Sequence, residues 1–503
     1  MKSKSMTRRS FLEKSAVLTA GAALASAPAI GKINAPEIMP SRGDRPAPSD
    51  RLNVAGIGVG GRGGSDVDGI AKAGANMVAL CDVDWKYAEN KFNQYPDAKK
   101  YKDYRVLFDE MGKDIDAVIV GTPDHTHAVI SATALEMGKH VYCEKPLTHT
   151  VYETRLLTKL AAKNKVATQM GNQGASGNGV RGTCEAIWSG MIGEVTRVDA
   201  FTDRPIWPQG LETPTHVDKI PKTLDWNLFT GPAKPRPFNT IYHPWNWRGW
   251  WDYGTGALGD MACHILQPVT QALKLKYPIA VQGSSTALMI DCAPNAQIVK
   301  YKFPARDNMP KVGMPAVEVT WYDGGLKPDF PKGWPVGKDM NDSGGAVIFY
   351  GTKDTLVCGC YGVNPWLLSG RPIPTPTMTR EVPNQDHHAD FVRACMESPV
   401  SRVLTASDFS VAGPLNEMVV MGVLGVRLQG LNRELLWDGE NMKFTNIGAD
   451  ETITFKVKDG FSVKEGHPTF NHVYSEPVNA LEFAAELIRH KYYNGYALPE
   501  MPK

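Results

Sequence analysis

The chain has 503 residues, more than one hydrophobic core usually supports, so we expect at least two domains. Its 42% hydrophobic and 21% charged residues are typical of folded proteins and exclude a largely disordered chain. The formal net charge is +2 and no long basic run is present, which argues against nucleic acid as a partner, because phosphate binding needs clustered Lys and Arg.

The N-terminus has the pattern of an export signal. A charged stretch with paired arginines, TRRSFLEK at 7–14, precedes a short apolar run that ends at small residues. The arginine pair is typical of twin-arginine (Tat) signals, and an ordinary Sec signal or a short membrane anchor is the alternative. We therefore predict a Tat-type signal over 1–30, a Pro-rich arm or linker over 31–50, a periplasmic location and no membrane span.

From residue 51 the sequence alternates between apolar runs and helical stretches. The apolar runs read LNVAGIGV, NMVALCDVD, DAVIVGTP, HVYCEKP and VATQMGN. Strands that are apolar throughout and separated by helices predict a parallel sheet covered on both faces. This pattern ends near residue 171.

Beyond residue 172 the runs become longer and the connections become rich in Pro and Trp. Segments such as VTRVDAFTDR, IVKYKFPA, AVEVTWYD and AVIFYGTKDTLVCGC predict a second, α+β domain over 172–503 with a large, mostly antiparallel sheet. The connection 203–250 is too long for an ordinary loop, so we expect it to be functional. Helical patterns return at 387–397, 406–429 and 479–491.

A glycine motif, Gly56-x-Gly58-x-x-Gly61, follows the first apolar run and opens a helical stretch. This context predicts a dinucleotide site, because the glycines allow the backbone to approach a pyrophosphate at the helix N-terminus. Asp82 ends the second run, where its carboxylate can accept hydrogen bonds from ribose hydroxyls and repel a 2′-phosphate. We therefore expect NAD rather than NADP, although Arg62 could offset that repulsion. A glycine-rich turn with an unrelated surface Asp is the alternative.

Polar residues also follow the next two apolar runs. Thr122, Pro123 and His127 come after one run, and Glu144 and Lys145 come after the other. Because ligands in open α/β sheets bind outside the carboxyl ends of the strands, we expect these residues to lie on the nicotinamide side, with Lys145 facing the reactive ring. A solvated surface lysine is the alternative.

Together these motifs resemble those of the Gfo/Idh/MocA oxidoreductase family. The matching features are the glycine motif, Asp82, TPDHTHA, the Glu144-Lys145-Pro146 signature and GTGALGDMACH at 254–264. LLWDGENMKFTN and KYYNGYALP resemble segments of its Bacteroidetes-type members. The resemblance implies a Rossmann domain over 51–171, NAD(P)-dependent oxidation of a secondary alcohol on a sugar or cyclitol, and a homodimer or homotetramer formed through the C-terminal sheet.

The resemblance also implies catalytic roles for three residues. Lys145 corresponds to the catalytic lysine, and Asp260 and His264 correspond to an acid/base pair of the substrate domain. Their i, i+4 spacing places both on one helix face, where the carboxylate can orient the imidazole. A surface or capping pair is the alternative. Whether His264 or Lys145 accepts the substrate proton stays open.

The segment HPWNWRGWWDYG at 243–254 is the expected carbohydrate wall. Aromatic faces pack against sugar C–H groups and polar groups bind hydroxyls, although we expect at least half of these rings to anchor the long loop instead. His387-His388 after Asp386 is interpreted as a helix start rather than a metal site, and no metal is expected. The predicted substrate-binding residues are Asn172, Arg181, Arg204, Arg248, Trp250, Trp251 and Tyr253.

Export constrains the function, because free NAD is scarce outside the cytoplasm. An exported dehydrogenase must hold its cofactor tightly and regenerate it in place. The first hypothesis is an NAD-dependent oxidoreductase acting on a secondary hydroxyl of a sugar or glycoside. The alternatives are a redox-neutral glycosidase or lyase, which oxidises, eliminates and re-reduces, and a non-catalytic NAD- or sugar-binding protein.

Overall fold

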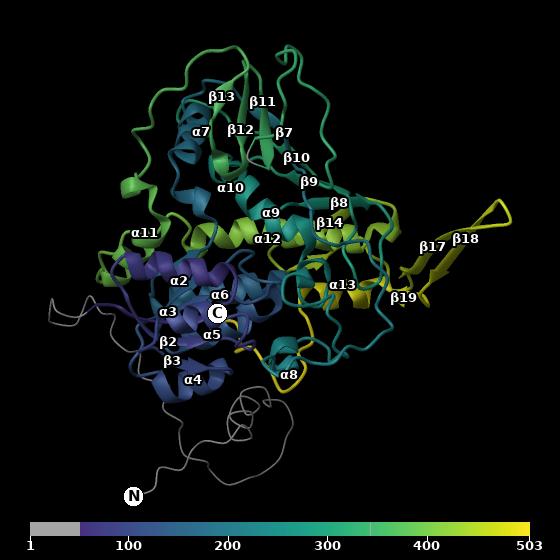
Figure 1. Ribbon diagram of the computed structural model, residues 1–503. Helices are drawn as coiled ribbons and strands as arrows, with labels where there is room; N and C mark the ends of the chain where they lie inside the picture. The colour runs from purple at the N-terminus through teal and green to yellow at the C-terminus, as the bar shows by residue number, and fades with distance from the viewer. Residues whose placement is uncertain (1–50, 343, 503) are drawn as a thin grey trace, which may run out of the picture.

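The computed structural model describes residues 51–342 and 344–502 (Figure 1). The predicted export signal and Pro-rich arm lie outside the described residues. Within the described ranges one helix, α12 (Phe409–Arg427), is long and apolar enough to cross a membrane, and 83% of its apolar window is buried inside the protein.

The first sheet has six parallel strands in the order β3-β2-β1-β4-β5-β6. This doubly wound order confirms the predicted parallel sheet and places a topological switch point between β1 and β4. The strands are β1 (Asn53–Ile57), β2 (Asn76–Cys81), β3 (Lys99–Tyr101), β4 (Ala117–Val120), β5 (His140–Cys143) and β6 (Thr168–Met170). The helices are α2 (Arg62–Lys72), α3 (Glu89–Gln94), α4 (Tyr104–Met111), α5 (Asp124–Glu136) and α6 (Val151–Asn164).

The second sheet has nine strands in the order β13-β12-β11-β7-β10-β9-β8-β14-β15. It is antiparallel except between β7 and β10, which confirms the predicted α+β domain with a large, mostly antiparallel sheet. Its strands are β7 (Val195–Thr202), β8 (Ala280–Ser285), β9 (Gln297–Phe303), β10 (Val317–Tyr322), β11 (Gly345–Gly351), β12 (Thr355–Gly359), β13 (Trp366–Leu367), β14 (Leu435–Asp438) and β15 (Lys443–Phe444).

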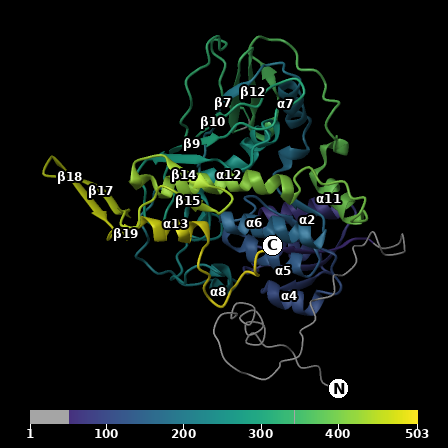
Figure 2. The same cartoon turned by 180° about the vertical axis from the view of Figure 1, so that it is seen from behind.

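Helix α12 joins the two domains, because it packs against α6 of the first domain and against β8 and β9 of the second. Figures 1 and 2 show it as a long helix between the two halves. Helix α9 (Gly256–Ile265), which carries Asp260 and His264, packs against α12 and α10 (Gln267–Ala272). The remaining helices of this domain are α7 (Asn178–Trp188), α8 (Trp226–Thr230) and α11 (His387–Met396). Asp386 caps α11 by accepting from the backbone of His388 and Ala389, which confirms the predicted helix start.

The last part of the chain leaves this sheet and returns to the first domain. The exposed hairpin of β17 (Lys456–Lys464) and β18 (His467–Tyr474) projects from the body, beside the short pair β16 (Thr452–Ile453) and β19 (Val478–Asn479) (Figures 1 and 2). Helix α13 (Ala480–Ile488) follows, and the C-terminal end of the chain then lies over the first domain.

Candidate active site

A cleft lies where the carboxyl ends of β1, β2, β4 and β5 face the second domain. The first domain contributes the glycine loop, Asp82, Thr122, Pro123 and Lys145. The second domain contributes the connection between β7 and α9, which was expected to be functional. From that connection the cleft is lined by Leu228, Phe229, His243, Pro244, Trp245, Trp247 and Arg248.

The glycine loop begins two residues later than the motif at Gly56 implies. Gly56 lies inside β1, where a Cβ would meet Val67 and Leu80, and it does not line the cleft. Ladder pairing continues to Ile57, so the turn starts at Gly58, which has a φ of +80°. The same spacing recurs as Gly58-x-Gly60-x-x-Gly63, and a Cβ at Gly63 would lie 2.1 Å from the Gly58 carbonyl oxygen. Gly61 lines the cleft next to α2.

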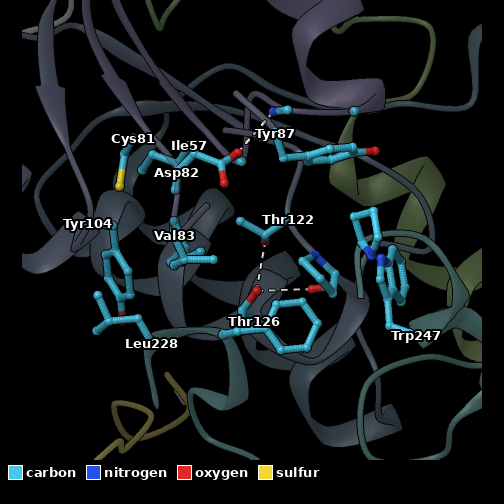
Figure 3. Close-up of a pocket in the computed structure, with 18 of the residues that line it drawn as sticks. Ile57, Cys81, Asp82, Val83, Tyr87, Tyr104, Thr122, Thr126, Leu228 and Trp247 are labelled. Atoms are coloured by element: carbon cyan, nitrogen blue, oxygen red, sulfur yellow. Dashed lines mark hydrogen bonds between the residues drawn. The ribbon is translucent and has the colours of Figure 1, made fainter. Parts of the chain in front are cut away.

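Asp82 holds this loop at the end of β2. Its Oδ2 accepts hydrogen bonds from the backbone of Val59 and Gly60, both at 2.9 Å, and its side chain points into the cleft (Figure 3). Burial raises the pKa of Asp82 to about 6. A carboxylate in this position can accept ribose hydroxyls, as the sequence predicts.

Arg62 does not lie against Asp82. Its Nε donates to Glu144 Oε1 at 3.2 Å and its guanidinium also pairs with Asp66 at 3.1 Å. The positive charge of Arg62 is therefore paired with Glu144 and Asp66, and it does not offset the repulsion between Asp82 and a 2′-phosphate. Glu144 in turn accepts from the Lys145 backbone at 3.1 Å, which places Glu144 as a residue that orients its neighbour.

Thr122 and Pro123 line the cleft, whereas His127 lies behind it. The ring nitrogens of His127 lie 2.7 Å from the Thr122 carbonyl and 2.8 Å from the Pro146 carbonyl, and both donate only when the ring is protonated. Burial opposes that charge, but Cys143, Asp124 and the Pro146 carbonyl raise the pKa of His127 to about 10. His127 thus ties together the loops after β4 and β5, and it positions Lys145 rather than touching a ligand.

Lys145 is joined to the second domain through Asp260. Its Nζ donates to Asp260 Oδ1 at 2.7 Å and to the Asp260 carbonyl at 2.8 Å. Arg248 reaches the same carboxylate oxygen at 2.8 Å, with its guanidinium between the rings of Trp245 (4.6 Å) and Trp247 (4.5 Å). Burial opposes the charge on Asp260, but Lys145 and Arg248 hold its pKa well below the usual range.

The predicted pairing of Asp260 with His264 is not a hydrogen bond in this structure, because the carboxylate faces the two cations instead. His264 is buried, and its Nδ1 has no hydrogen-bond partner among the described residues. Burial and the nearby Lys145 cation lower the pKa of His264 well below its ordinary value, so the ring is neutral. Its ring centroid lies 4.5 Å from that of Tyr361, a non-glycine residue with a φ of +63°.

The sequence did not predict a role for Tyr361. This residue follows strand β12, and its neighbours in the chain give no sign that its ring packs against His264 of α9.

The tryptophan-rich segment divides into two parts. Trp245, Trp247 and Arg248 line the cleft. Trp250 and Tyr253 are completely buried in an aromatic cluster with Trp226, Phe229 and Tyr242 and do not line the cleft. Trp247 belongs to the same cluster and reaches the cleft at its edge. Trp251 is also buried, beneath the Arg427 guanidinium. These three predicted substrate residues anchor the loop, which is the alternative that the sequence left open.

Three further predicted substrate residues do not line the cleft. Asn172 is buried and donates to Gln267 at 2.5 Å. Arg181 binds the segment 376–379 through the Thr379 hydroxyl and two carbonyls. Arg204 pairs with its neighbour Asp203 at 2.5 Å. Their polar groups therefore support the second domain rather than this cleft.

Comparison with protein families agrees with the geometry. Residues 52–172 match the model of an oxidoreductase family with an NAD-binding Rossmann fold, and residues 183–305 match the C-terminal alpha/beta domain of the same family. The chain belongs to the Gfo/Idh/MocA oxidoreductase family. The prediction of an NAD-binding Rossmann domain is therefore confirmed.

Individual relatives match parts of the chain. Inositol 2-dehydrogenase of Salmonella typhimurium is 31% identical over 147 residues, 28% of this chain and 43% of that protein. A glycosyl hydrolase family 109 protein of Shewanella sp. is 29% identical over 208 residues, 38% of this chain and 45% of that protein. These matches span less than half of either relative. The WlbA dehydrogenase from Bordetella pertussis, solved with NADH and UDP-GlcNAcA, shares the fold with a TM-score of 0.51 and 14% identity over 77% of this chain and 99% of that one.

Proposed function

We propose that the protein is an NAD-dependent oxidoreductase that transfers hydride at a carbon bearing a secondary hydroxyl on a sugar or glycoside. The observation that carries this proposal is the position of Lys145, which lies in the cleft of an NAD-binding Rossmann domain and is joined to Asp260 of the other domain, a carboxylate that Arg248 also binds. A relative named inositol 2-dehydrogenase supports a substrate whose ring carries secondary hydroxyls.

The residues of the cleft fit NAD. The glycine loop at the N-terminus of α2 offers backbone N–H groups to a pyrophosphate, Asp82 offers acceptors to ribose hydroxyls, and Thr122 and Pro123 lie toward Lys145. When bound, NAD supplies the hydride acceptor. A 2′-phosphate would meet the Asp82 carboxylate without a compensating Arg62, so NAD is preferred over NADP.

The protein's own groups handle the oxygen and its proton. Lys145 is a donor held by Asp260, and it stabilises the negative charge that develops on the substrate oxygen. The Nδ1 of His264 has no hydrogen-bond partner among the described residues, so this buried ring offers a free acceptor for the hydroxyl proton, and Lys145 is the alternative acceptor. Arg248 fixes the Asp260 carboxylate, which in turn holds Lys145 in place. Trp245 and Trp247 form an aromatic wall suited to sugar C–H groups.

A redox-neutral glycosidase or lyase is the second candidate, favoured by the similarity to a glycosyl hydrolase family 109 protein. Oxidation of a ring hydroxyl to a ketone acidifies the neighbouring C–H, a base removes that proton, and the glycosidic group leaves as a double bond forms. In a glycosidase water then adds across the double bond, in a lyase it does not, and in both the ketone is reduced again by the returned hydride. Both candidates use the same cleft, and both fit a tightly held cofactor that is recycled in place. A non-catalytic NAD- or sugar-binding protein is the third candidate.

Two further proposals concern the whole protein. The twin-arginine pattern supports export to the periplasm, and the outer face of the nine-stranded sheet, with Tyr322, Tyr350 and Trp366 half-buried on it, supports a homo-oligomer. Cell fractionation and light scattering of the purified protein test these two proposals separately.

One set of assays separates the candidates. Purified protein is denatured and the supernatant is assayed for released NAD(H), which we expect in near-stoichiometric amount. Intact protein is then incubated with aryl glycosides and with free sugars, without added NAD. Oxidised sugar that appears only with an acceptor supports the dehydrogenase, and aglycone release without net oxidation supports the glycosidase. Failure to carry or bind NAD(H) contradicts both.

A further inference from the structure

Residues 489–498 follow α13 and reach the cleft through one side chain, and they are here called the C-terminal strap. Tyr492 hydrogen-bonds through its hydroxyl to Glu153 at the start of α6 in the first domain. Tyr493 N donates to the Pro232 carbonyl at 2.9 Å, and Asn494 donates to the Gly231 carbonyl at 2.7 Å, both just after α8. The strap is therefore attached both to the first domain and to the segment after α8.

One side chain of the strap, Tyr496, lines the cleft. The guanidinium of Arg105 lies 4.8 Å from the centroid of its ring. Arg105 is itself buried and is fixed by two hydrogen bonds to Asp103, at 2.8 and 2.6 Å. The ring is thus supported from one side by a cation that cannot easily move.

The order of the strands shows which end of the cleft Tyr496 closes. Asp82, the ribose acceptor, ends β2, and Tyr104 follows β3, the outer neighbour of β2. Tyr104 and Leu228 lie together on the side of the cleft opposite Trp247 (Figure 3). Beyond the ribose acceptor the cleft is lined by the apolar or aromatic side chains of Val83, Tyr104, Ile130, Leu228 and Tyr496, together with Lys102 and Asp103. The flat apolar faces suit a purine base, and the polar groups beside them can bind its edge.

We propose that the strap forms the outer wall of the adenine subsite, with Tyr496 contacting the base, so that NAD cannot leave until the strap detaches. This inference rests on the proposed function, because it assigns an adenine to this end of the cleft. It gives the protein a structural means of keeping its cofactor, and it assigns that role to residues far from the glycine loop in sequence.

Replacement of one tyrosine tests the proposal. Wild-type protein and Tyr496→Ala are loaded with NADH and passed through a desalting column, and the bound nicotinamide is followed over time by its fluorescence. Loss of one base–aromatic contact is expected to speed release by about tenfold or more. Tyr493→Ala is the matched control, because it lies in the same strap, does not line the cleft and keeps its backbone hydrogen bond.

A fragment of the cofactor separates a contact with adenine from general loosening of the strap. Reduced nicotinamide mononucleotide lacks the adenylate part, so Tyr496→Ala should bind it as wild type does, whereas ADP-ribose should bind more weakly. Unchanged NADH release from Tyr496→Ala, or equal acceleration in Tyr493→Ala, overturns the inference while leaving the proposed function standing. A wild-type protein that binds no NADH overturns the proposed function itself.

Discussion

The two ends of the cleft are built from different chemistry. At the Lys145 end, the Asp260 carboxylate oxygen lies 2.7 Å from the Lys145 nitrogen and 2.8 Å from a nitrogen of Arg248, so charged groups of both domains meet there. At the opposite end, the cleft is lined mainly by aromatic and apolar side chains, among them Tyr104, Leu228 and Tyr496, which come from three distant parts of the chain. Electrostatic groups act most strongly where they are buried and fixed, whereas apolar groups contribute retention in proportion to area. The difference assigns reaction to one end and cofactor retention to the other.

The largest expected effect is at the charged end. Lys145→Met removes the donor to the substrate oxygen and leaves Asp260 paired with Arg248 alone. We expect kcat to fall by about 10²–10³-fold, the usual consequence of removing one fixed donor from a developing oxyanion. The measurement is steady-state turnover of whichever sugar or glycoside the wild-type protein accepts.

The same variant should leave cofactor retention unchanged, because Lys145 is remote from the adenine end. Bound NAD(H) after desalting is therefore the paired readout. Loss of cofactor together with activity would mean that the two ends are not separate. Full activity in Lys145→Met would remove the lysine from the mechanism.

Acidification should weaken cofactor binding through Asp82. The pKa of this carboxyl in the folded, ligand-free protein is about 6, so below that pH it gains a proton and loses an acceptor for the ribose. NAD affinity should fall by about tenfold per pH unit below pH 6, as expected for one linked proton. Calorimetric titrations between pH 5 and pH 8, chosen as about one to two units on either side of that pKa, measure this change.

Unfolding does not account for such a loss. The folded pKa of Asp82 is raised above its unfolded value of about 3.9, so this group adds stability that is fully present below about pH 3.9 and is lost as pH rises through about 6. Acid therefore weakens binding while the contribution of Asp82 to folding grows. Asp82→Asn is the control: its affinity should be lower at neutral pH and flat across the same pH range.

Lys145 and the ribose acceptor Asp82 could be located from the sequence because both follow short, regular strands, and the order of parallel strands brings such ends to one edge. The start of the glycine loop could not be located from the sequence, because the G-x-G-x-x-G motif begins at both Gly56 and Gly58. Only the length of β1, which ends at Ile57, shows that the turn starts at Gly58. The adenine end was not predicted, because contact of Tyr496 with a cleft in the first domain depends on the path of the chain after α13.

The tryptophan segment shows the same limit, since sequence alone does not reveal which rings face outward. Trp250 and Trp251 have the composition expected of a sugar wall, yet they are buried, whereas Trp245 is 46% exposed in the cleft. Which rings of this segment are buried depends on the aromatic cluster under the loop. That cluster includes Trp226 and Tyr242, which lie earlier in the chain.

The smallest expected effect distinguishes these two groups of rings. Trp245→Ala removes one face of the stack around Arg248, but Trp247 and Asp260 still hold the guanidinium. Because an exposed cation–π contact contributes about 0.5–1 kcal/mol, we expect kcat/KM to fall only about two- to fivefold, with thermal stability unchanged.

Trp250→Ala is the matched comparison, because it changes the same residue type five positions away. It should lower the free energy of unfolding by about 3–5 kcal/mol, since it empties a fully buried site. Thermal melts and kcat/KM measured on both variants separate the two roles. If Trp245→Ala destabilises the protein as strongly as Trp250→Ala does, then Trp245 belongs to the loop core, and the aromatic wall of the charged end is reduced to Trp247.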